Sequence, residues 1–346
     1  MNKTLQDYAI LINDTIQSNE INHYITTDNM CQNLGGIDTF KNINIPQGKV
    51  RSFQKDDILL SNIRLYFRKV YRAKQKGGCS SDVLVFRAKH IDSATLFAIL
   101  SSQIFTDYAC LGSQGSKMPR GNKTHMMNFK IPTINFTIAK IFNSIQNKIE
   151  NNHKINELLH TLAHKVYEYY FKYKPKNAKL EQIIIENPKS NIMVKNAQKT
   201  QDKYPFFTSG DNTLSYPKAI IDGRNCFLNT GGNAGIKFYV GKASYSTDTW
   251  CIGANEFSDY LYLLLSSIKT HINQSFFQGT SLKHLQKNLL KKYPIYMPSA
   301  HEIKKFNQII MPLLTLISIN TRISKRLEQI RDFLLPLLLK QQVKPK

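Results

Sequence analysis

This sequence is constrained most by an internal duplication, because its first half can be laid over its second half at a nearly constant shift. Leu100-Ser101-Ser102 ends an apolar run, and it recurs 165 positions later as Leu265-Ser266-Ser267 at the end of a similar run. Four further pairs keep shifts of 164 to 166 positions: Gln114-Gly115-Ser116 with Gln278-Gly279-Thr280, Ile131-Pro132 with Met297-Pro298, Phe142-Asn143 with Phe306-Asn307, and Ile155-Asn156 with Ile319-Asn320. The period is too long for a solenoid repeat. We therefore expect two copies of a whole domain, each with the segment that follows it, presenting two related surfaces to two related targets.

The net charge indicates what those targets are. The chain has 47 Lys and Arg residues against 24 Asp and Glu residues, a formal net charge of +23. A charge of that size attracts polyanions. Nucleic acid is the favoured partner, and the alternatives are an anionic membrane or a charge that serves only solubility. No basic amphipathic terminus favours a membrane, and no apolar run approaches the roughly 20 residues that span a bilayer, so we expect no membrane partner.

The cysteines and the N-terminus indicate the compartment. The five cysteines are scattered and form no CxxC pair, so neither a zinc site nor a disulfide framework is expected. None of the nine histidines has a metal-ligand spacing with another ligand. The apolar run from Tyr8 to Ile12 is too short for a signal peptide. Together these features favour the reducing cytoplasm.

Two mixed domains alternate with two long helical segments, which predicts an α+β fold. The first domain, residues 1–138, has strand-like runs at 57–60 and 82–86, separated by glycine-containing turns, and one helix at about 93–108. A linker and the second domain occupy residues 173–300. Two domains of ordinary size fit a chain of 346 residues.

Residues 139–172 and 301–342 are each predicted to be one helix, with mostly apolar residues at alternating steps of three and four. The first seam is Ile138, Phe142, Ile145, Ile149, Asn152, Asn156, Leu159, Ala163, Val166 and Tyr170. The second seam is Phe306, Ile309, Leu313, Leu316, Asn320, Ile323, Leu327, Ile330, Leu334 and Leu337. We expect the two helices to form an antiparallel coiled coil; the alternative is that each packs only on its own domain. Pro312 is expected to kink the second helix or break its first turns.

Both seams contain asparagine, and Asn156 and Asn320 correspond in the repeat. An asparagine at a seam position costs stability but fixes register. We expect these two residues to set the register of the helix pair. Tolerated polarity at a partly wet seam is the alternative interpretation.

Several segments resemble the specificity subunits of type I restriction–modification systems. In the first half they are residues 53–70 (FQKDDILLSNIRLYFRKV), 77–86 (GGCSSDVLVF) and 115–121 (GSKMPRG), and in the second half 204–210 (YPFFTSG) and 331–336 (RDFLLP). The resemblance spans nearly the whole chain in domain–helix–domain–helix order. One departure, Leu65 where many relatives have Pro, is a loop detail.

The resemblance implies a DNA-reading subunit without an active site. Each target-recognition domain would read one half of a split, asymmetric site in double-stranded DNA, and the two spacer helices would set the unread gap and dock two methyltransferase subunits. Those subunits bind S-adenosylmethionine, so no cofactor is expected in this chain, and restriction–translocase subunits join the same assembly. A specificity subunit of a type II-like restriction–modification enzyme is an alternative, and so is a nucleic-acid-binding scaffold outside restriction.

Basic, aromatic and amide residues are the candidate DNA contacts, because Arg pairs with guanine, Asn with adenine, and Lys suits phosphate. The first cluster is Arg64, Tyr66, Arg68, Lys69 and Arg72. If this segment is extended, Arg64, Tyr66 and Arg68 share one side. The remaining candidates are Lys117, Arg120 and Lys123 in one loop, Ser281, Lys283 and Lys287 in its repeat mate, and Asn229, Asn233 and Lys237 around a glycine-rich turn. Ordinary surface charge and a tight turn are the alternatives.

No segment has the pattern of a catalytic motif. An adenine methyltransferase carries Asn-Pro-Pro followed by an aromatic residue, whereas Asn187-Pro188 is followed by Lys. Residues 231–235 form neither GxGxxG nor a P-loop, and Glu302-x-Lys304 lacks the upstream acidic partner of a nuclease site. We therefore expect no enzyme. Methyl transfer by the isolated chain would instead establish a DNA enzyme, and loss of preference for duplex DNA over RNA would point to an RNA-binding protein.

Overall fold

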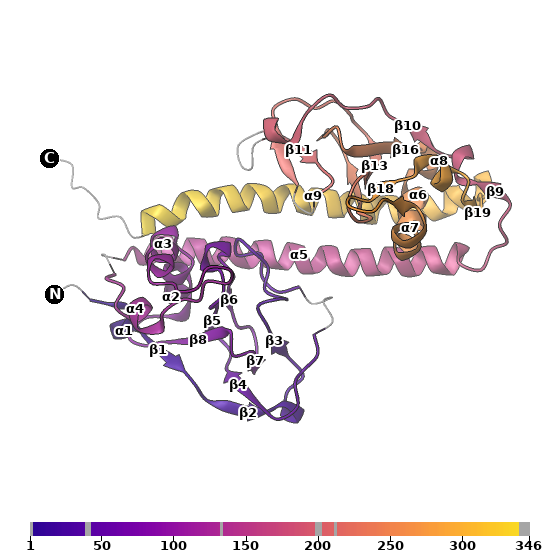
Figure 1. Ribbon diagram of the computed structural model, residues 1–346. Helices are drawn as coiled ribbons and strands as arrows, with labels where there is room; N and C mark the ends of the chain where they lie inside the picture. Colours follow the sequence, from indigo (N-terminus) through magenta and orange to yellow (C-terminus); the bar gives the residue numbers. More distant parts are fainter. Residues whose placement is uncertain (1–2, 39–42, 132–133, 198–202, 211–212, 339–346) are drawn as a thin grey trace. The chain divides into compact units, whose positions relative to one another are not determined.

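The computed structural model describes residues 3–38, 43–131, 134–197, 203–210 and 213–338 (Figure 1). The chain divides into two compact units, Met1–Asn151 with Lys325–Lys346, and Asn152–Ser324. Each unit contains one mixed domain and the stretches of the two long helices that pack on it. The expected α+β content is confirmed. Pro132 of the repeat and residues 339–342 of the expected second helix lie outside the described residues.

The first unit has two four-stranded sheets. The main sheet has the order β1-β8-β5-β6 with antiparallel neighbours, and the second has the order β2-β4-β7-β3, in which β3 and β7 run parallel. The strands are β1 (Ala9–Ile12), β2 (Thr15–Gln17), β3 (Tyr24–Ile25), β4 (Lys49–Phe53), β5 (Ile58–Ser61), β6 (Val70–Arg72), β7 (Gly77–Cys79) and β8 (Val83–Ala88). The strands expected at 57–60 and 82–86 are confirmed as β5 and β8.

The helices of the first domain are short. They are α1 (Leu5–Tyr8), η1 (Ser18–Glu20), η2 (Leu65–Phe67), α2 (Ser93–Leu100), α3 (Gln103–Leu111) and α4 (Lys123–Met127). The single helix expected at 93–108 is wrong, because the chain breaks before α3. Ser102 has extended backbone angles and its Oγ accepts a hydrogen bond from the Phe105 N–H at 3.2 Å, which is an N-cap. Among the described residues no single helix is long and apolar enough to cross a membrane, although α2 and α3, bent by 60°, pass that test as a pair by length and composition.

The second unit repeats the order of the main sheet of the first. Its main sheet, β10-β16-β13-β14, is antiparallel like β1-β8-β5-β6, and β11 runs parallel to β15 as β3 does to β7. Its strands are β9 (Ala178–Lys179), β10 (Ile185–Glu186), β11 (Tyr204–Phe207), β12 (Leu214–Tyr216), β13 (Arg224–Asn229), β14 (Ile236–Val240), β15 (Ser244–Tyr245), β16 (Thr249–Gly253), β17 (Phe277–Gln278), β18 (His284–Leu285) and β19 (Pro294–Ile295). The duplication seen in the sequence is therefore a duplication of fold.

The helices of the second domain also follow the order of the first. They are η3 (Leu180–Gln182), η4 (Val194–Asn196), η5 (Asn255–Phe257), α6 (Ser258–Ser267), α7 (Lys269–Ser275) and α8 (Lys287–Lys291). The successive helices α6 and α7 correspond to α2 and α3, and Leu265-Ser266-Ser267 ends α6 as Leu100 ends α2. The strongest repeat anchor of the sequence therefore marks the same helix end in both domains.

The long helices α5 (Phe136–Phe171) and α9 (Ala300–Leu338) are attached to the domains by repeat-related phenylalanines. Phe142 of α5 is fully buried and packs on Phe97 of α2, with ring centroids 5.5 Å apart. Phe306 of α9 is fully buried in the second unit, 4.9 Å from Phe171. Burying one such ring contributes on the order of 2–3 kcal/mol, so each helix is part of a domain core.

Within the second unit α5 and α9 run antiparallel. The Asn152 amide donates to Ser324 Oγ at 3.2 Å, and the Asn320 amide donates to Asn156 Oδ1 at 3.0 Å. The partner number on α9 falls as the number on α5 rises, which is the direction expected for the pair. All ten predicted seam positions of α5 are buried or half-buried, so the seam predicted for this helix lies on its packed face.

Four of the ten seam positions predicted for α9 are wrong. Phe306, Leu313 and Asn320 lie inward, but Ile309, Leu316, Ile323 and Ile330 are each about 40–50 % exposed. The buried column is the next one around the helix: Ile303, Ile310, Ile317, Ser324 and Arg331. The apolar periodicity did not predict this buried column because it includes two polar residues, Ser324 and Arg331.

Pro312 does not end α9, which is continuous from Ala300 to Leu338. Pro312 lacks the N–H that would bond to the carbonyl of Gln308, and both residues are exposed. Water can satisfy that carbonyl, so the expected break in the first turns is wrong.

Candidate nucleic-acid interface

Two candidate DNA-binding segments of the first domain meet at one end of its main sheet. The turn that follows β5 lies against the loop before α4, because the Arg64 N–H donates to the Pro119 carbonyl at 2.9 Å and the Gly121 N–H donates to the Asn62 carbonyl at 3.1 Å. Ile63 and Arg120 also form an isolated antiparallel bridge. We call residues 62–68 together with 113–123 the first loop pair.

The outer side chains of the first loop pair combine positive charge with an aromatic ring. Tyr66 is 54 % exposed, and Lys117 and Lys123 are exposed. Arg120 is exposed and forms an ion pair with Asp82 at 2.9 Å. The Arg64 guanidinium donates to the Lys117 carbonyl at 3.3 Å. These groups suit contacts to phosphate and to stacked or groove-lining bases.

The extended conformation considered for the first cluster is wrong. Residues 65–67 form the 3₁₀ turn η2, and it is flanked by Arg64 and Arg68 with left-handed φ values of 51° and 49°. The Arg68 N–H donates to the Leu65 carbonyl at 2.9 Å and closes the turn. Strand alternation therefore does not apply, and Arg64, Tyr66 and Arg68 do not form one face of a strand. The buried Leu65 side chain explains why the chain turns here.

Like Arg64, three other members of that cluster bind their own domain. The Arg68 guanidinium donates to the Ser101 carbonyl at 2.8 Å, and burial lowers the pKa of Arg68. The Lys69 ammonium donates to the Thr27 carbonyl. Arg72 lies 3.6 Å from Asp56 with a mostly buried side chain. These contacts give each residue a structural role and leave DNA contact by it as a prediction only.

The second domain has a corresponding arrangement, which we call the second loop pair: residues 229–235 together with 278–285. The Gly232 N–H donates to the Lys283 carbonyl at 2.9 Å, and the Leu285 N–H donates to the Thr230 carbonyl at 3.0 Å. Asn233, Ser281 and Lys283 are exposed. Basic and amide groups therefore gather after corresponding strands of the two main sheets, β5 in the first domain and β13 in the second.

Three other candidates of the second domain lie inward. Asn229 is 7 % exposed and its amide donates to the Asn233 carbonyl at 3.1 Å, so it shapes the turn and does not reach outward. Its Oδ1 has no hydrogen-bond partner among the described residues. The Lys237 ammonium donates to the carbonyls of Thr208 and Gly210. Lys287 lies 5.1 Å above the Trp250 ring, and burial lowers its pKa. The sequence pattern gave no sign of these inward partners.

Asn156 and Asn320, which occupy corresponding positions in the two halves of the duplication, are hydrogen-bonded to each other. Besides accepting from Asn320, Asn156 donates to Thr321 Oγ1 at 3.3 Å. A partly buried amide pair of this kind is satisfied in only one alignment of the helices. The geometry is what a register-setting pair requires, and that role stays a prediction.

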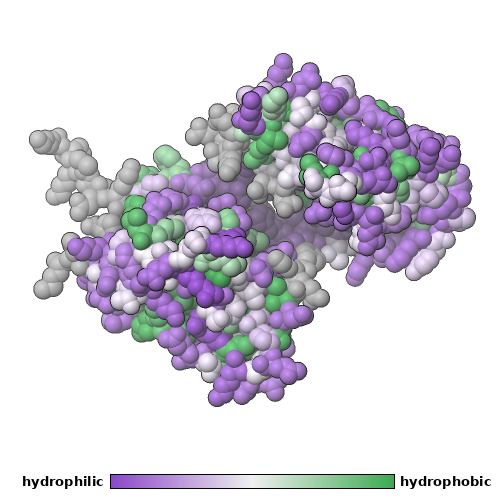
Figure 2. Space-filling view, viewed as in Figure 1, coloured by the Kyte–Doolittle hydropathy of each residue, from purple (hydrophilic) through white to green (hydrophobic). Residues whose placement is uncertain are grey.

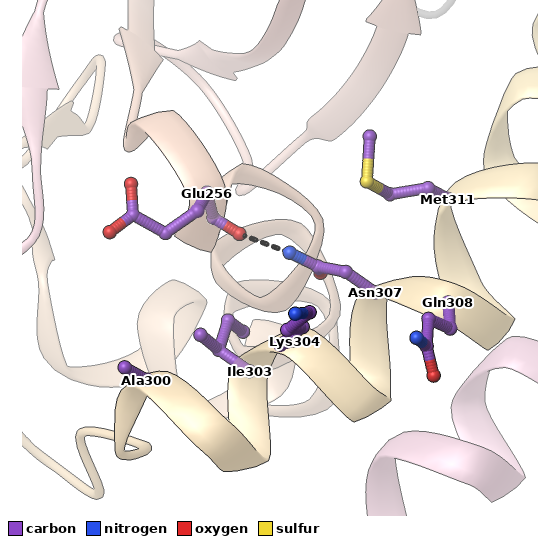
Figure 3. A pocket seen from close by; sticks show the side chains of 7 residues that line it. All are labelled: Glu256, Ala300, Ile303, Lys304, Asn307, Gln308 and Met311. Carbon is purple, nitrogen blue, oxygen red and sulfur yellow. Dashed lines mark hydrogen bonds between the residues drawn. The ribbon is translucent and has the colours of Figure 1, made fainter.

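Glu302 caps a helix. Its carboxylate accepts from the Ser299 N–H at 3.0 Å and from Tyr296 Oη at 2.7 Å, and these bonds hold the pKa of Glu302 down at about 2. Ser299 and Glu302 form a capping box at the start of α9. A neighbouring pocket of about 430 Å³ is lined by Glu256, Ala300, Ile303, Lys304, Asn307, Gln308 and Met311. Figure 3 shows the Asn307 amide spanning it to the Glu256 carbonyl, at 2.8 Å.

The pocket lining and the visible surface differ in polarity. Most of the pocket lining is apolar, and in the described part of the chain no three His, Cys, Asp or Glu residues group as metal ligands. Hydrophilic residues cover most of the face in Figure 2, and hydrophobic ones form small separate patches. The chemistry available at the loop pairs is binding of an anionic, hydrogen-bonding ligand.

Residues 176–329 match the family model of the type I restriction modification DNA specificity domain. This chain carries a type I restriction–modification DNA specificity domain. The family resemblance seen in the sequence is thereby confirmed. The matched segment contains the second loop pair and most of α9, so the candidate residues of the second domain lie inside a DNA specificity domain.

The specificity domain also has solved structural relatives. The chain is similar to the S subunit of a type I restriction–modification system from M. genitalium, with a TM-score of 0.65, 14 % identity, and 99 % of this chain and 96 % of that chain covered. That likeness shows the fold. The HsdS subunit from Thermoanaerobacter tengcongensis matches with a TM-score of 0.37 and 12 % identity over 99 % of this chain and 96 % of that chain. No curated protein matches the chain.

Proposed function

We propose that this chain is the DNA sequence-specificity subunit of a type I restriction–modification complex, and that its two domains each read one half of a split, asymmetric site in double-stranded DNA. The observation that supports the proposal is the combination of a matched specificity domain at 176–329 with a main sheet of the same strand order in the first unit. Two copies of one reading fold on a single chain suit two different half-sites.

The loop pairs are the proposed DNA-contacting surfaces. Lys117, Lys123 and Lys283 would bind phosphates. Arg64 and Tyr66 of the first loop pair, and Asn233 of the second, would each approach base edges or sugar–phosphate at their own loop pair. The charge of +23 adds a sequence-independent attraction to duplex DNA. The proposed domains are residues 1–138 and 173–300, and the proposed spacer helices are 139–172 and 301–342.

The helix pair is proposed to be an antiparallel coiled coil that sets the unread gap and docks partner subunits. Support comes from α9, where Ile309, Leu316, Ile323 and Ile330 form an exposed apolar column separate from its packed face. On α5, Ile155, Leu162 and Tyr169 form a similar exposed column at seven-residue spacing. Exposed apolar columns of this kind suit helices of a partner. The proposed partners are two methyltransferase subunits and the restriction subunits.

In this proposal the chain has no catalytic role and acts in the cytoplasm. S-adenosylmethionine belongs to the methyltransferase partners, which supply the reactive methyl group. The chain contributes DNA selection and geometry. Calorimetry of the isolated chain with S-adenosylmethionine is expected to give no binding, and clear 1:1 binding would contradict this part of the proposal.

The test of function is to express the chain with its methyltransferase partner in a host that lacks adenine methylation, and to map the methylated adenines. The expected result is one split motif, with two defined blocks of bases separated by a fixed unread gap. Expression of the methyltransferase without this chain is the control and should leave DNA unmodified. A continuous motif, or methylation that does not depend on this chain, would contradict the proposal.

A further inference from the structure

One arginine of α9 is buried deeply enough to need a specific explanation. The Arg331 side chain is 2 % exposed and is among the largest fully buried side chains of the chain. Its guanidinium donates to Gln146 Oε1 at 3.0 Å, to the Asn33 carbonyl at 3.3 Å and to Asp332 Oδ1 at 3.1 Å. A buried charge is costly unless its hydrogen bonds are made, so Arg331 is committed to this geometry.

Arg331 and Gln146 together grip two consecutive carbonyls of the first domain. Gln146 of α5, which is also buried, donates to the Leu34 carbonyl at 2.7 Å. Asn33 and Leu34 have left-handed φ values of 53° and 61°. That conformation is unfavourable for leucine in particular and persists only where surrounding contacts hold it. The two helix side chains supply those contacts.

Asn33 and Leu34 in turn hold the 3₁₀ turn η2, which carries Tyr66. The Asn33 N–H donates to the Phe67 carbonyl at 2.9 Å, and the Leu34 N–H donates to the Arg68 carbonyl at 3.1 Å. A continuous chain of hydrogen bonds therefore runs from Arg331 through residues 33–34 to the end of η2. Arg64 and Arg68, at the two ends of η2, are also left-handed, so backbone strain is concentrated along this path.

We propose that Arg331 is a positioning residue for DNA reading by the first domain: it fixes the shape of the first loop pair from within α9 and does not touch DNA itself. The proposal rests on the proposed function, because it assigns a specificity role to a residue outside the reading surface. A merely packed residue at this position would need volume and no donors, whereas the observed geometry uses all three guanidinium nitrogens.

The test compares Arg331→Met and Arg331→Lys in the full chain assembled with its methyltransferase subunits. Methionine keeps much of the volume and removes every donor, while lysine keeps the charge and part of the donor capacity. The readout is the base preference at each position of the two half-sites, from methylation mapping, at a temperature where melting curves show all variants folded. Arg331→Met should lower selectivity at one half-site by about tenfold and leave the other unchanged, and Arg331→Lys should restore part of it.

Two further variants keep the result decisive. Gln146→Met removes the bond to the Leu34 carbonyl and should affect the same half-site, so it substitutes for Arg331→Met if that variant does not fold. Arg224→Met removes a matched contact in the second unit, where Arg224 bridges Asp259 and Thr315 of α9, and should spare that half-site. Equal loss at both half-sites, or unchanged selectivity in the Arg331 and Gln146 variants, overturns the proposal. A wild-type assembly without a split motif contradicts the proposed function instead.

Discussion

At the scale of single residues, the charge of a side chain did not reveal its role. Lys117 and Lys283 are exposed on the loop pairs, whereas Arg68 and Lys287 carry the same charge and lie against their own domain. The sequence pointed to the segments that form the two loop pairs, because charge clustered in loops and recurred in both halves; DNA contact by them stays a prediction. It could not separate outward from inward side chains, since that depends on carbonyls such as that of Ser101, far away along the chain.

Lys117→Ala and Lys283→Ala should each weaken binding to specific and random duplex DNA about equally. Each removes one phosphate contact, so the slope of log K against log salt should flatten by about one. Fluorescence titrations of the assembled complex at several salt concentrations measure this. Lys55→Ala is the control, since this exposed lysine lies in the turn before β5, at the opposite end of that strand from Tyr66. A changed base preference with an unchanged slope would contradict the assignment to phosphate.

Arg68→Ala should act on stability. The substitution leaves the Ser101 carbonyl without its donor and empties a half-buried site, for an expected loss of about 1–3 kcal/mol in the free energy of unfolding. Urea unfolding measures it. Arg64→Ala is the comparison, and it should instead lose roughly 1–3 kcal/mol on the specific site if Arg64 reads a guanine. Equal behaviour of the two variants in both assays would show that the inward–outward distinction is wrong.

Glu302→Gln should lower the melting temperature at neutral pH by a few degrees, as expected for loss of part of a capping box worth about 1 kcal/mol. The folded pKa of Glu302 is depressed from 4.5 to about 2. Its contribution is therefore complete above about pH 4.5 and is lost as the pH falls toward 2. Melting curves at pH 7, 4 and 2.5 should show that the difference in melting temperature between wild type and variant becomes smaller as the pH falls. A difference in melting temperature that stays constant over this pH range would contradict the role of the Glu302 charge. Glu181→Gln, at an exposed glutamate, is the control.

At the scale of elements, periodicity predicted the helices better than their packed faces. The two heptad segments were confirmed as α5 and α9, but the packed column of α9 includes Ser324 and Arg331, which an apolar pattern cannot include. The break before α3 was missed because a single Ser N-cap inside an apolar segment is a weak signal. Topology was recoverable only in part: the duplication was visible in short anchors, whereas the strand order depends on contacts distant in the sequence.

The Asn156–Asn320 pair gives a prediction at this scale. Replacing both by Leu should raise the melting temperature, since one buried and one half-buried amide are replaced by apolar surface. It should also weaken the preference for one helix alignment. Asn320→Leu alone should be less stable than the double variant, because Asn156 loses the partner that donates to it at 3.0 Å. Melting curves and mapping of the gap length in the assembled enzyme test both effects. A double variant with lower stability and a single sharp gap would contradict a register role.

At the scale of the whole molecule, the proposed function rests on the duplication and on the net charge. One copy of the repeated main sheet is matched over 176–329 to a DNA specificity domain, and a net charge of +23 fits the DNA partner proposed for both copies. The helices that link the copies are cores of both units, since Phe142 and Phe306 are buried in one unit each. The proposed role of the helices in setting the unread gap rests on this sharing.

The most direct test of this account is to shorten the helix pair and map the methylated sites. Removing residues 152–158 and 318–324 deletes one heptad from each helix. The two deleted segments face each other, because Asn152 is bonded to Ser324 and Asn156 to Asn320, and Gln146 and Arg331 stay in place. The pair shortens by about 10 Å, which corresponds to about three base pairs of B-DNA at 3.4 Å each. We expect the shortened assembly to methylate sites with the same two half-site sequences, separated by an unread gap that is shorter by about three base pairs. An active enzyme with an unchanged gap would contradict it.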